Sequence, residues 1–167
     1  MPTLNGSGQW VTVQGRVRVV GRRITLIPSL PAGITTSTGW ELAPVGALSA
    51  AEGDHVSVDG RLAGDVLEVT GWTADAGPDA LHRHLRAVDG VPHAVAVAVS
   101  HPGVEAGLIG MGMTTNRRGE WANVVHVAWA TEQTRQWVAA QPPRSVYVHG
   151  FVRDAGLPAL LWSEAQR

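Results

Sequence analysis

Tryptophan is the most prominent binding-capable residue type, because it supplies seven of the nine aromatic side chains. A flat indole stacks on a nucleic-acid base of any identity, and each such contact contributes about 1–3 kcal/mol. The same ring also fills hydrophobic cores. For Trp72, Trp137 and Trp162 we favour the structural role, since two occupy equivalent positions of a repeat and the third lies on an expected helix.

Three other tryptophans are candidates for base stacking. Strict alternation along the expected strand 120–130 places Trp121 and Trp129 on one face of that strand. Trp40 opens the corresponding strand in the first half of the chain. For Trp121 and Trp40, base stacking and burial in a core are equally good interpretations of the pattern.

Arginine accounts for all 13 cationic side chains, since the sequence contains no lysine. Guanidinium groups bind phosphate oxygens through charge-assisted, often bidentate hydrogen bonds. Two arginines share the polar face of the expected first strand, two lie in the turn beyond it, and two are expected at a hairpin tip of the second half: Arg16, Arg18, Arg22, Arg23, Arg117 and Arg118. They could follow a phosphate backbone, although the solvated outer face of a barrel explains them equally well.

The sequence contains no recognisable catalytic constellation. It lacks the Gly-x-Ser-x-Gly, phosphate-loop and His-Glu-x-x-His patterns. His82 and His84, with Asp79 and Asp89 nearby, suggest a metal site, but residues two apart do not share a helix face and no cysteine completes a ligand set. We therefore expect a protein that is not an enzyme, with no catalytic residues, no metal site and no cofactor.

Composition excludes several other classes of protein. Without cysteine there is no disulfide framework, thiolate zinc site or iron–sulfur cluster. No apolar stretch approaches the roughly 20 residues that span a bilayer, and the N-terminus does not resemble a signal peptide. We expect a cytoplasmic protein with no membrane partner. Its residue usage is typical of a GC-rich bacterial genome, and its net charge of −1 leaves room for a local arginine stripe.

The elements that position these residues are predicted to be mostly strands. Short valine-rich runs recur between glycine-containing turns, as in small antiparallel barrels and sandwiches. Helical spacing is convincing only around 79–88 and 131–141. The expected strands are 11–19, 23–28 and 39–45 followed by a hairpin over 55–72, then 93–100, 104–114 and 120–130 followed by a hairpin over 145–163.

An internal repeat supports two similar halves. The segment 56–62 aligns with 146–152, and in both copies a leucine follows the central glycine by seven residues and a tryptophan follows it by twelve. We interpret each copy as a hairpin whose mid-strand glycine, Gly60 or Gly150, marks a bulge or bend.

The predicted fold is all-β, with two tandem five-stranded OB-fold barrels. Three strands, a connector and two strands follow the order of that barrel in each half. The expected domains are 1–75, the first barrel, and 93–167, the second, joined by a linker over 76–92 with a short helix. The segment 94–99 is apolar on both faces, which indicates that both are covered and favours a homo-oligomer or an interface between the barrels.

The second half resembles the bacterial single-stranded-DNA-binding proteins of the OB-fold family. The resemblance rests on Glu120-Trp121-Ala-Asn-Val124-Val125, a following helix, and the strand Val146-Tyr-Val-His-Gly150-Phe-Val. It implies a sheet face that stacks bases on aromatic side chains, with Trp121 at the family's stacking position. An aromatic position farther along that strand falls near Val127 instead, and Trp129 is the substitute. The family's acidic C-terminal tail is absent from residues 162–167.

Two functional hypotheses follow. In the first, the chain binds single-stranded DNA, or alternatively RNA, with little base preference, and serves replication, recombination or repair. Trp121, Trp129 and Trp40 stack on bases while the six arginines hold phosphates. In the second, the same fold is an adaptor module that contacts other proteins, which the near-neutral charge and the missing tail favour.

Overall fold

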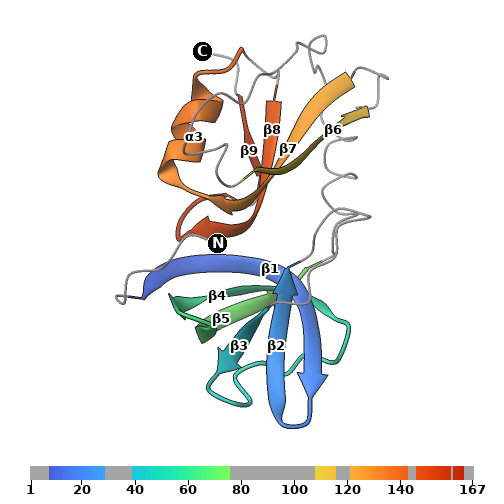
Figure 1. Ribbon diagram of the computed structural model, residues 1–167, viewed down its shortest axis with the longest axis vertical. Coiled ribbons are helices and arrows are strands. Elements are labelled where there is room, and N and C mark those ends of the chain that lie inside the picture. The colour runs from blue at the N-terminus through green and yellow to red at the C-terminus, as the bar shows by residue number, and fades with distance from the viewer. Residues whose placement is uncertain are drawn as a thin grey trace. The chain divides into compact units, whose positions relative to one another are not determined.

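The computed structural model describes residues 8–28, 39–75, 108–115, 121–142, 146–158 and 160–163. These residues are mostly in strands, with one short helix, so the all-β prediction is confirmed for the described part of the chain (Figure 1). The chain divides into two compact units, Met1–Pro78 and Asp79–Arg167. The expected linker 76–92, the strand 93–100 and the turn carrying Arg117 and Arg118 lie outside the described residues.

The first unit contains five strands whose pairings form a closed ring. The strands are β1 (Gln9–Val20), β2 (Arg23–Pro28), β3 (Trp40–Ala43), β4 (His55–Ala63) and β5 (Val66–Ala74). β1 pairs with β2 and β4, β2 with β3, and β4 with β5, all antiparallel. A parallel pairing between β3 and β5 completes the ring. The predicted strands 11–19, 23–28 and 39–45 and the hairpin 55–72 correspond to these elements.

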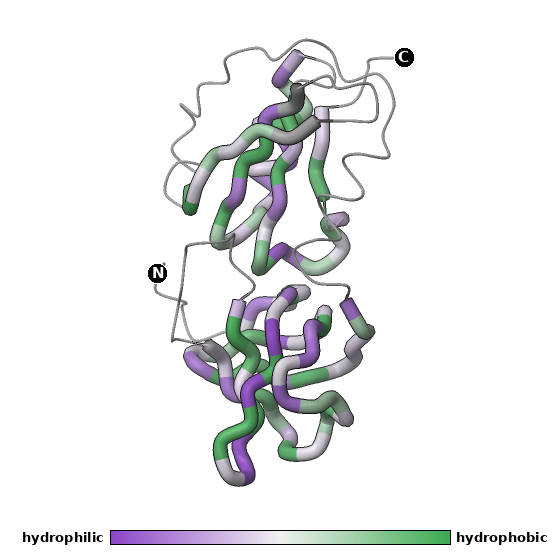
Figure 2. The backbone as a smooth tube through the Cα atoms, turned by 90° about the vertical axis from the view of Figure 1, so that its right-hand side faces the viewer, coloured by the Kyte–Doolittle hydropathy of each residue, from purple (hydrophilic) through white to green (hydrophobic). Residues whose placement is uncertain are grey.

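Alternation along β1 builds the core of this unit, as the sequence predicts. Val11, Val13 and Val17 are buried, whereas Arg16 and Arg18, between and beyond them, are exposed. Figure 2 shows hydrophobic and hydrophilic residues alternating along the strands. The remaining buried side chains come from the other four strands and one connector residue: Leu26, Ile27, Trp40, Leu42, Leu48, Val56, Val58, Leu62 and Leu67.

The glycine in the middle of β4 marks a bulge, as expected. Asp59 pairs with Gly71 and Gly60 pairs with Val69, so Thr70 is the extra residue on β5. A Cβ atom on Gly60 would stand 2.2 Å from the backbone oxygen of Glu68. Only glycine therefore permits the close approach of β4 to β5 at this point.

The second unit has four described strands and a helix: β6 (Leu108–Thr115), β7 (Trp121–Ala130), α3 (Glu132–Ala139), β8 (Val146–Asp154) and β9 (Leu160–Trp162). Within the described residues of this unit, β6 pairs antiparallel with β7, β7 pairs parallel with β8, and β8 pairs antiparallel with β9. The succession of elements is the predicted one. The direct parallel pairing of β7 with β8 is possible because α3 provides the crossover between them.

Helix α3 begins and ends where the sequence predicts within about two residues. Thr131 caps it: the Thr134 backbone N–H donates to the Thr131 hydroxyl, and the Thr131 N–H donates to the Thr134 hydroxyl in return. A hydrogen bond from the Arg135 guanidinium lowers the pKa of the Glu132 carboxyl in the first turn.

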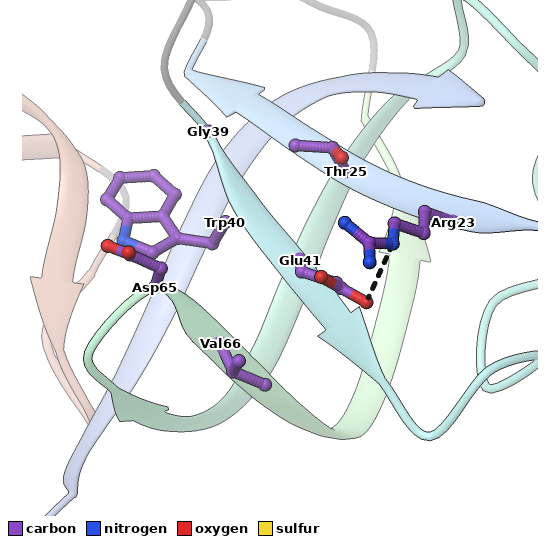
Figure 3. Close-up of a pocket in the computed structure, with 7 residues that line it drawn as sticks. All are labelled: Arg23, Thr25, Gly39, Trp40, Glu41, Asp65 and Val66. Carbon is purple, nitrogen blue, oxygen red and sulfur yellow. Dashed lines mark ion pairs between the residues drawn. The ribbon is translucent and has the colours of Figure 1, made fainter. Parts of the chain in front are cut away.

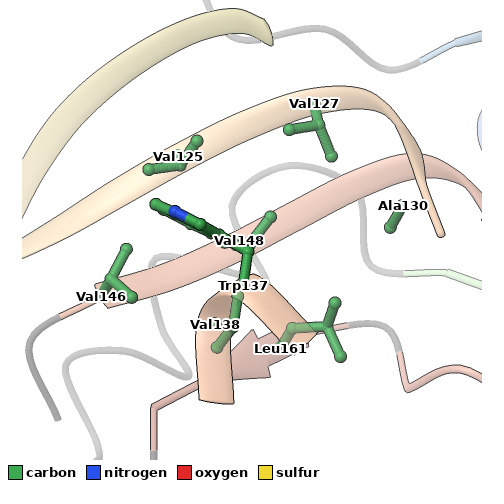
Figure 4. Close-up of a cluster of buried hydrophobic side chains, with 8 residues drawn as sticks. All are labelled: Val125, Val127, Ala130, Trp137, Val138, Val146, Val148 and Leu161. Atoms are coloured by element: carbon green, nitrogen blue, oxygen red, sulfur yellow. The ribbon is translucent and has the colours of Figure 1, made fainter. Parts of the chain in front are cut away.

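The helix packs its apolar side against the β7–β8–β9 sheet. Trp137 and Val138 contribute from the helix, as Figure 4 shows, and the strands contribute the rest of the cluster: Val125, Val127, Ala130, Val146, Val148 and Leu161. Trp137 therefore has the structural role expected for it.

The two copies of the repeat differ in strand register. Trp72 pairs with Val58, whereas Trp162 pairs with Tyr147, which is one position earlier in the aligned repeat. The extra residue Thr70 in the first copy accounts for this offset, because it shifts the rest of β5 by one position. Trp72 is half-buried. Trp162, for which the sequence predicted a structural role, is 38% exposed and stacks on Tyr147 with ring centroids 6.1 Å apart.

Candidate nucleic-acid interface

The β1–β2 hairpin carries concentrated positive charge. Residues 9–28 include four arginines and no acidic residue, and all four arginine side chains are exposed: Arg16, Arg18, Arg22 and Arg23. The tight turn between the strands depends on Gly21, whose φ of 63° lies in the left-handed region that glycine adopts without strain. The hairpin therefore presents the four guanidinium groups that the sequence singled out in the first unit.

Strand pairing places the arginines among identifiable neighbours. Arg18 lies opposite Thr25 of β2, Thr25 lies opposite Glu41 of β3, and Glu41 lies opposite Val66 of β5. Directly opposed residues of paired strands point to the same face of the sheet. This row of four residues therefore crosses the outer face of the first unit from β1 to β5.

Trp10 lies on the same face of β1 as Arg16 and Arg18, because it is separated from each by an even number of residues. It is 56% exposed and lies opposite Arg61 of β4, which makes a 3.0 Å ion pair with Glu68. At about 3.4 Å per residue, Trp10 and Arg18 are about 27 Å apart along the strand. The outer face of β1 thus combines an exposed indole with guanidinium groups.

Sequence reasoning gave Trp10 no role because the valine alternation that defines the strand begins at Val11. The signal that could have identified Trp10 is its phase. Counted backwards from Thr12 and Gln14, the period of two puts Trp10 on the polar face rather than the valine face.

Trp40, one of the predicted stacking residues, faces the core. It pairs with Leu26, shares its side of β3 with Leu42, and is only 8% exposed. Glu41 lies between them and points to the opposite side of the strand. Since a stacked base needs an open ring face, this arrangement assigns Trp40 to the core of the first unit and leaves Trp10 as its exposed indole.

A pocket of about 440 Å³ opens where β2, β3 and β5 meet. Its lining is Arg23, Thr25, Gly39, Trp40, Glu41, Asp65 and Val66. Figure 3 shows the side chains of Arg23, Thr25 and Glu41 together on one side of β3, with Trp40 and Asp65 on the other. Arg23 Nε and Glu41 Oε1 are 4.0 Å apart.

In the second unit the structure describes only part of the predicted site. Trp129 is half-buried, and its Nε1 donates a 2.8 Å hydrogen bond to Asp154 Oδ1. Trp121 begins β7, but its side chain lies outside the described residues. The structure therefore gives Trp129 a hydrogen-bond partner within the second unit. The prediction that Trp121 and Trp129 stack bases from a shared face stays a prediction.

Other groups in the described residues of the second unit contribute mainly to packing. His126 stacks on Phe151 at a centroid distance of 6.2 Å, and His149 contacts Phe151 edge-on at 4.7 Å. Among the residues that the structure describes, no three acidic or histidine side chains are grouped to hold a metal ion. No helix in the described ranges is long and apolar enough to cross a membrane.

Comparisons with known proteins give no family or function for this chain, so the candidate site is identified from its geometry. No family model matches the chain, and searches of curated proteins and of solved structures found no significant match.

Proposed function

We propose that the first unit binds single-stranded nucleic acid along the outer face of β1 and the β1–β2 turn. The observation that carries this proposal is one face of an acid-free hairpin that exposes Trp10 near one end and Arg16 and Arg18 farther along, with the buried Thr12 and the half-buried Gln14 between them. Positive charge that tracks a phosphate backbone, combined with an aromatic platform, is the usual basis of sequence-tolerant single-strand binding. DNA is the proposed ligand and RNA the alternative.

We further propose that the first unit is a five-stranded barrel of the OB type. The ring of pairings from β1 through β2, β3, β5 and β4 back to β1 supports it. The second unit keeps the expected order of elements, but its parallel β7–β8 pairing is a different connection. The OB-type proposal is therefore confined to the first unit.

The resemblance to single-stranded-DNA-binding proteins remains a proposal about ancestry and role. Its Val146-Tyr147-Val148 segment begins β8 and is buried, and Val124 and Val125 are buried in β7. These residues therefore form part of the core of the second unit rather than a binding surface. A homo-oligomer that acts in cytoplasmic DNA replication or repair is the cellular role that this proposal implies.

The test is a titration of the full chain with a dT oligonucleotide of a few tens of bases, followed by tryptophan fluorescence. Stacking on Trp10 should quench the emission, and Trp10→Ala should remove most of that quenching and weaken binding about five- to a hundredfold. Trp162→Ala is the matched control, since Trp162 is the other exposed indole among the described residues, at 38%, but lies in the second unit.

Quenching that both variants retain would contradict the role of Trp10. The absence of binding at low salt would contradict nucleic-acid binding itself. Far-UV circular dichroism of Trp10→Ala checks that the fold persists, as an exposed side chain leads us to expect.

A protein-binding adaptor is the second candidate function. One observation favours it: β6 exposes Met111 and Met113 and has no charged residue along its length. Exposed methionines are common at surfaces that bind partner proteins. If the titration shows no nucleic-acid binding, Met111 and Met113 mark the surface where a protein partner should be sought.

A further inference from the structure

The pocket between β2, β3 and β5 lies beside the proposed binding face. Glu41, on its rim, belongs to the row that runs from Arg18 through Thr25 to Val66. Neighbouring strands are about 4.8 Å apart, so Glu41 lies about 10 Å across the sheet from Arg18. A strand whose phosphates contact the hairpin arginines therefore has a base within reach of the pocket.

The pocket offers a defined set of hydrogen-bonding groups. The Glu41 carboxylate only accepts, the Arg23 guanidinium only donates, and the Thr25 hydroxyl does both. The side chains of Arg23 and Glu41 are 76% and 43% exposed and stand 4.0 Å apart. An exposed ion pair of this kind is weak, so both groups are available to an incoming ligand. The volume of about 440 Å³ falls within the usual range for small-molecule sites.

These groups suit a base that carries an exocyclic amino group. Cytosine offers its N4 amino group as a donor to the Glu41 carboxylate, and its ring acceptors suit the Arg23 guanidinium. Thymine has an oxygen acceptor where cytosine has the amino group. Its single ring N–H is flanked by two carbonyl oxygens that would repel the carboxylate.

We propose that this pocket takes an amino-bearing base, so that the first unit binds cytosine strands more tightly than thymine strands. The inference rests on the proposed function, because it assumes that the nucleic acid follows β1 and β2. It adds a base preference to a surface whose stacking and phosphate contacts are indifferent to sequence.

The experiment compares dye-labelled dC and dT oligonucleotides of equal length by fluorescence anisotropy, with the full chain in slightly alkaline buffer. Both bases are pyrimidines, which keeps the stacking contribution similar. One hydrogen bond to a charged acceptor predicts a Kd for dC at least about threefold below that for dT. Glu41→Gln should make the two Kd values equal, since an amide can rotate to pair with either base.

Glu68→Gln is the matched control. Glu68 is also an exposed carboxylate in the first unit and is paired with an arginine, Arg61, but it lies outside the pocket. This substitution should strengthen binding of both oligonucleotides through the lost negative charge and leave the ratio of the two Kd values unchanged.

Each result is decisive. Equal affinity of the wild type for dC and dT would overturn the pocket inference and leave single-strand binding intact. A dC preference that persists in Glu41→Gln would place the discrimination elsewhere and also overturn it. Binding to neither oligonucleotide would overturn the proposed function and the pocket inference together.

Discussion

Gly60 shows how a single position shapes the first unit. A side chain there would collide with the Glu68 backbone rather than with a movable side chain. The bulge at Thr70 is held at the same place, where the Thr70 hydroxyl donates a 3.1 Å hydrogen bond to the Asp59 carbonyl. The close approach of the Gly60 and Glu68 backbones and the bulge at Thr70 together set the register of the β4–β5 hairpin.

Replacing Gly60 by alanine should destabilise the first unit by about 1–3 kcal/mol, because the backbone must shift to admit the methyl group. Gly71→Ala is the control, since a Cβ at Gly71 meets no atom within 4 Å. It should change the free energy of unfolding by less than about 0.5 kcal/mol. Urea unfolding followed by circular dichroism measures both, and equal destabilisation would refute the steric argument.

The residue-level predictions from the sequence were definite where alternation is strict and left the role of a residue open at strand ends. Arg16 and Arg18 lie within a clear alternation with valines, and both are exposed as predicted. Trp10 precedes the expected strand 11–19 and Trp40 is the second residue of the expected strand 39–45, so the pattern has too few preceding residues to set their phase. Tryptophan also suits a core and a binding surface equally well, so residue type could not compensate.

The β1–β2 hairpin is the element that determines the electrostatics of the proposed interface. Its four arginines lie within 20 residues that contain no acid, although the described part of the same unit holds seven acidic residues elsewhere. The chain therefore combines a net charge of −1 with a positively charged hairpin.

The hairpin predicts a measurable salt dependence. Each phosphate contact to a single strand contributes about 0.7 to the slope of log affinity against log salt. Because Arg23 is assigned to the base pocket, the three contacts from Arg16, Arg18 and Arg22 predict a slope of about −2.1. Arg16→Gln should reduce the magnitude of that slope by about 0.7. Arg135→Gln, on α3 of the second unit, should leave it unchanged. A slope near zero in the wild type would contradict phosphate binding by the hairpin.

Strands and helices were predictable where a capping residue, a proline or a glycine-containing turn marks their ends. Thr131 and Pro142 bracket α3, and glycine-containing turns separate β1 from β2 and β4 from β5. The parallel pairing of β7 with β8 was not predictable from the pattern of residues, because a helix crossover permits several partners for the next strand. The offset between the two repeat copies was equally hidden, since the spacing of glycine, leucine and tryptophan is identical in both.

At the scale of the whole molecule, the five strands of the first unit close a ring among themselves. Both long pairings of β1, with β2 and with β4, and the parallel closure by β3 and β5 lie within residues 9–74. The Glu41 N–H donates to the Asp65 carbonyl at 2.9 Å beside that closure. Its buried hydrophobic residues are contributed by the same strands and by Leu48 of the connector between β3 and β4.

A fragment of residues 1–78 should therefore fold by itself, with a free energy of unfolding of no more than about 5 kcal/mol because its core is small. Thermal unfolding followed by circular dichroism should show one cooperative transition. A fragment that carries both Trp10→Phe and Trp72→Phe has Trp40 as its single tryptophan. Below the transition temperature, acrylamide should quench the fluorescence of Trp40 only weakly, because its side chain is buried. A fragment without a cooperative transition would contradict the autonomy of this unit.

The arginine-only hairpin has a chemical consequence for its surroundings. A guanidinium stays protonated at alkaline pH values where a lysine ammonium is already losing its charge. Lysine acetylation, which removes positive charge from many nucleic-acid-binding surfaces, has no target in a sequence without lysine. Lysine acetyltransferases therefore have no means of neutralising the charge of this hairpin.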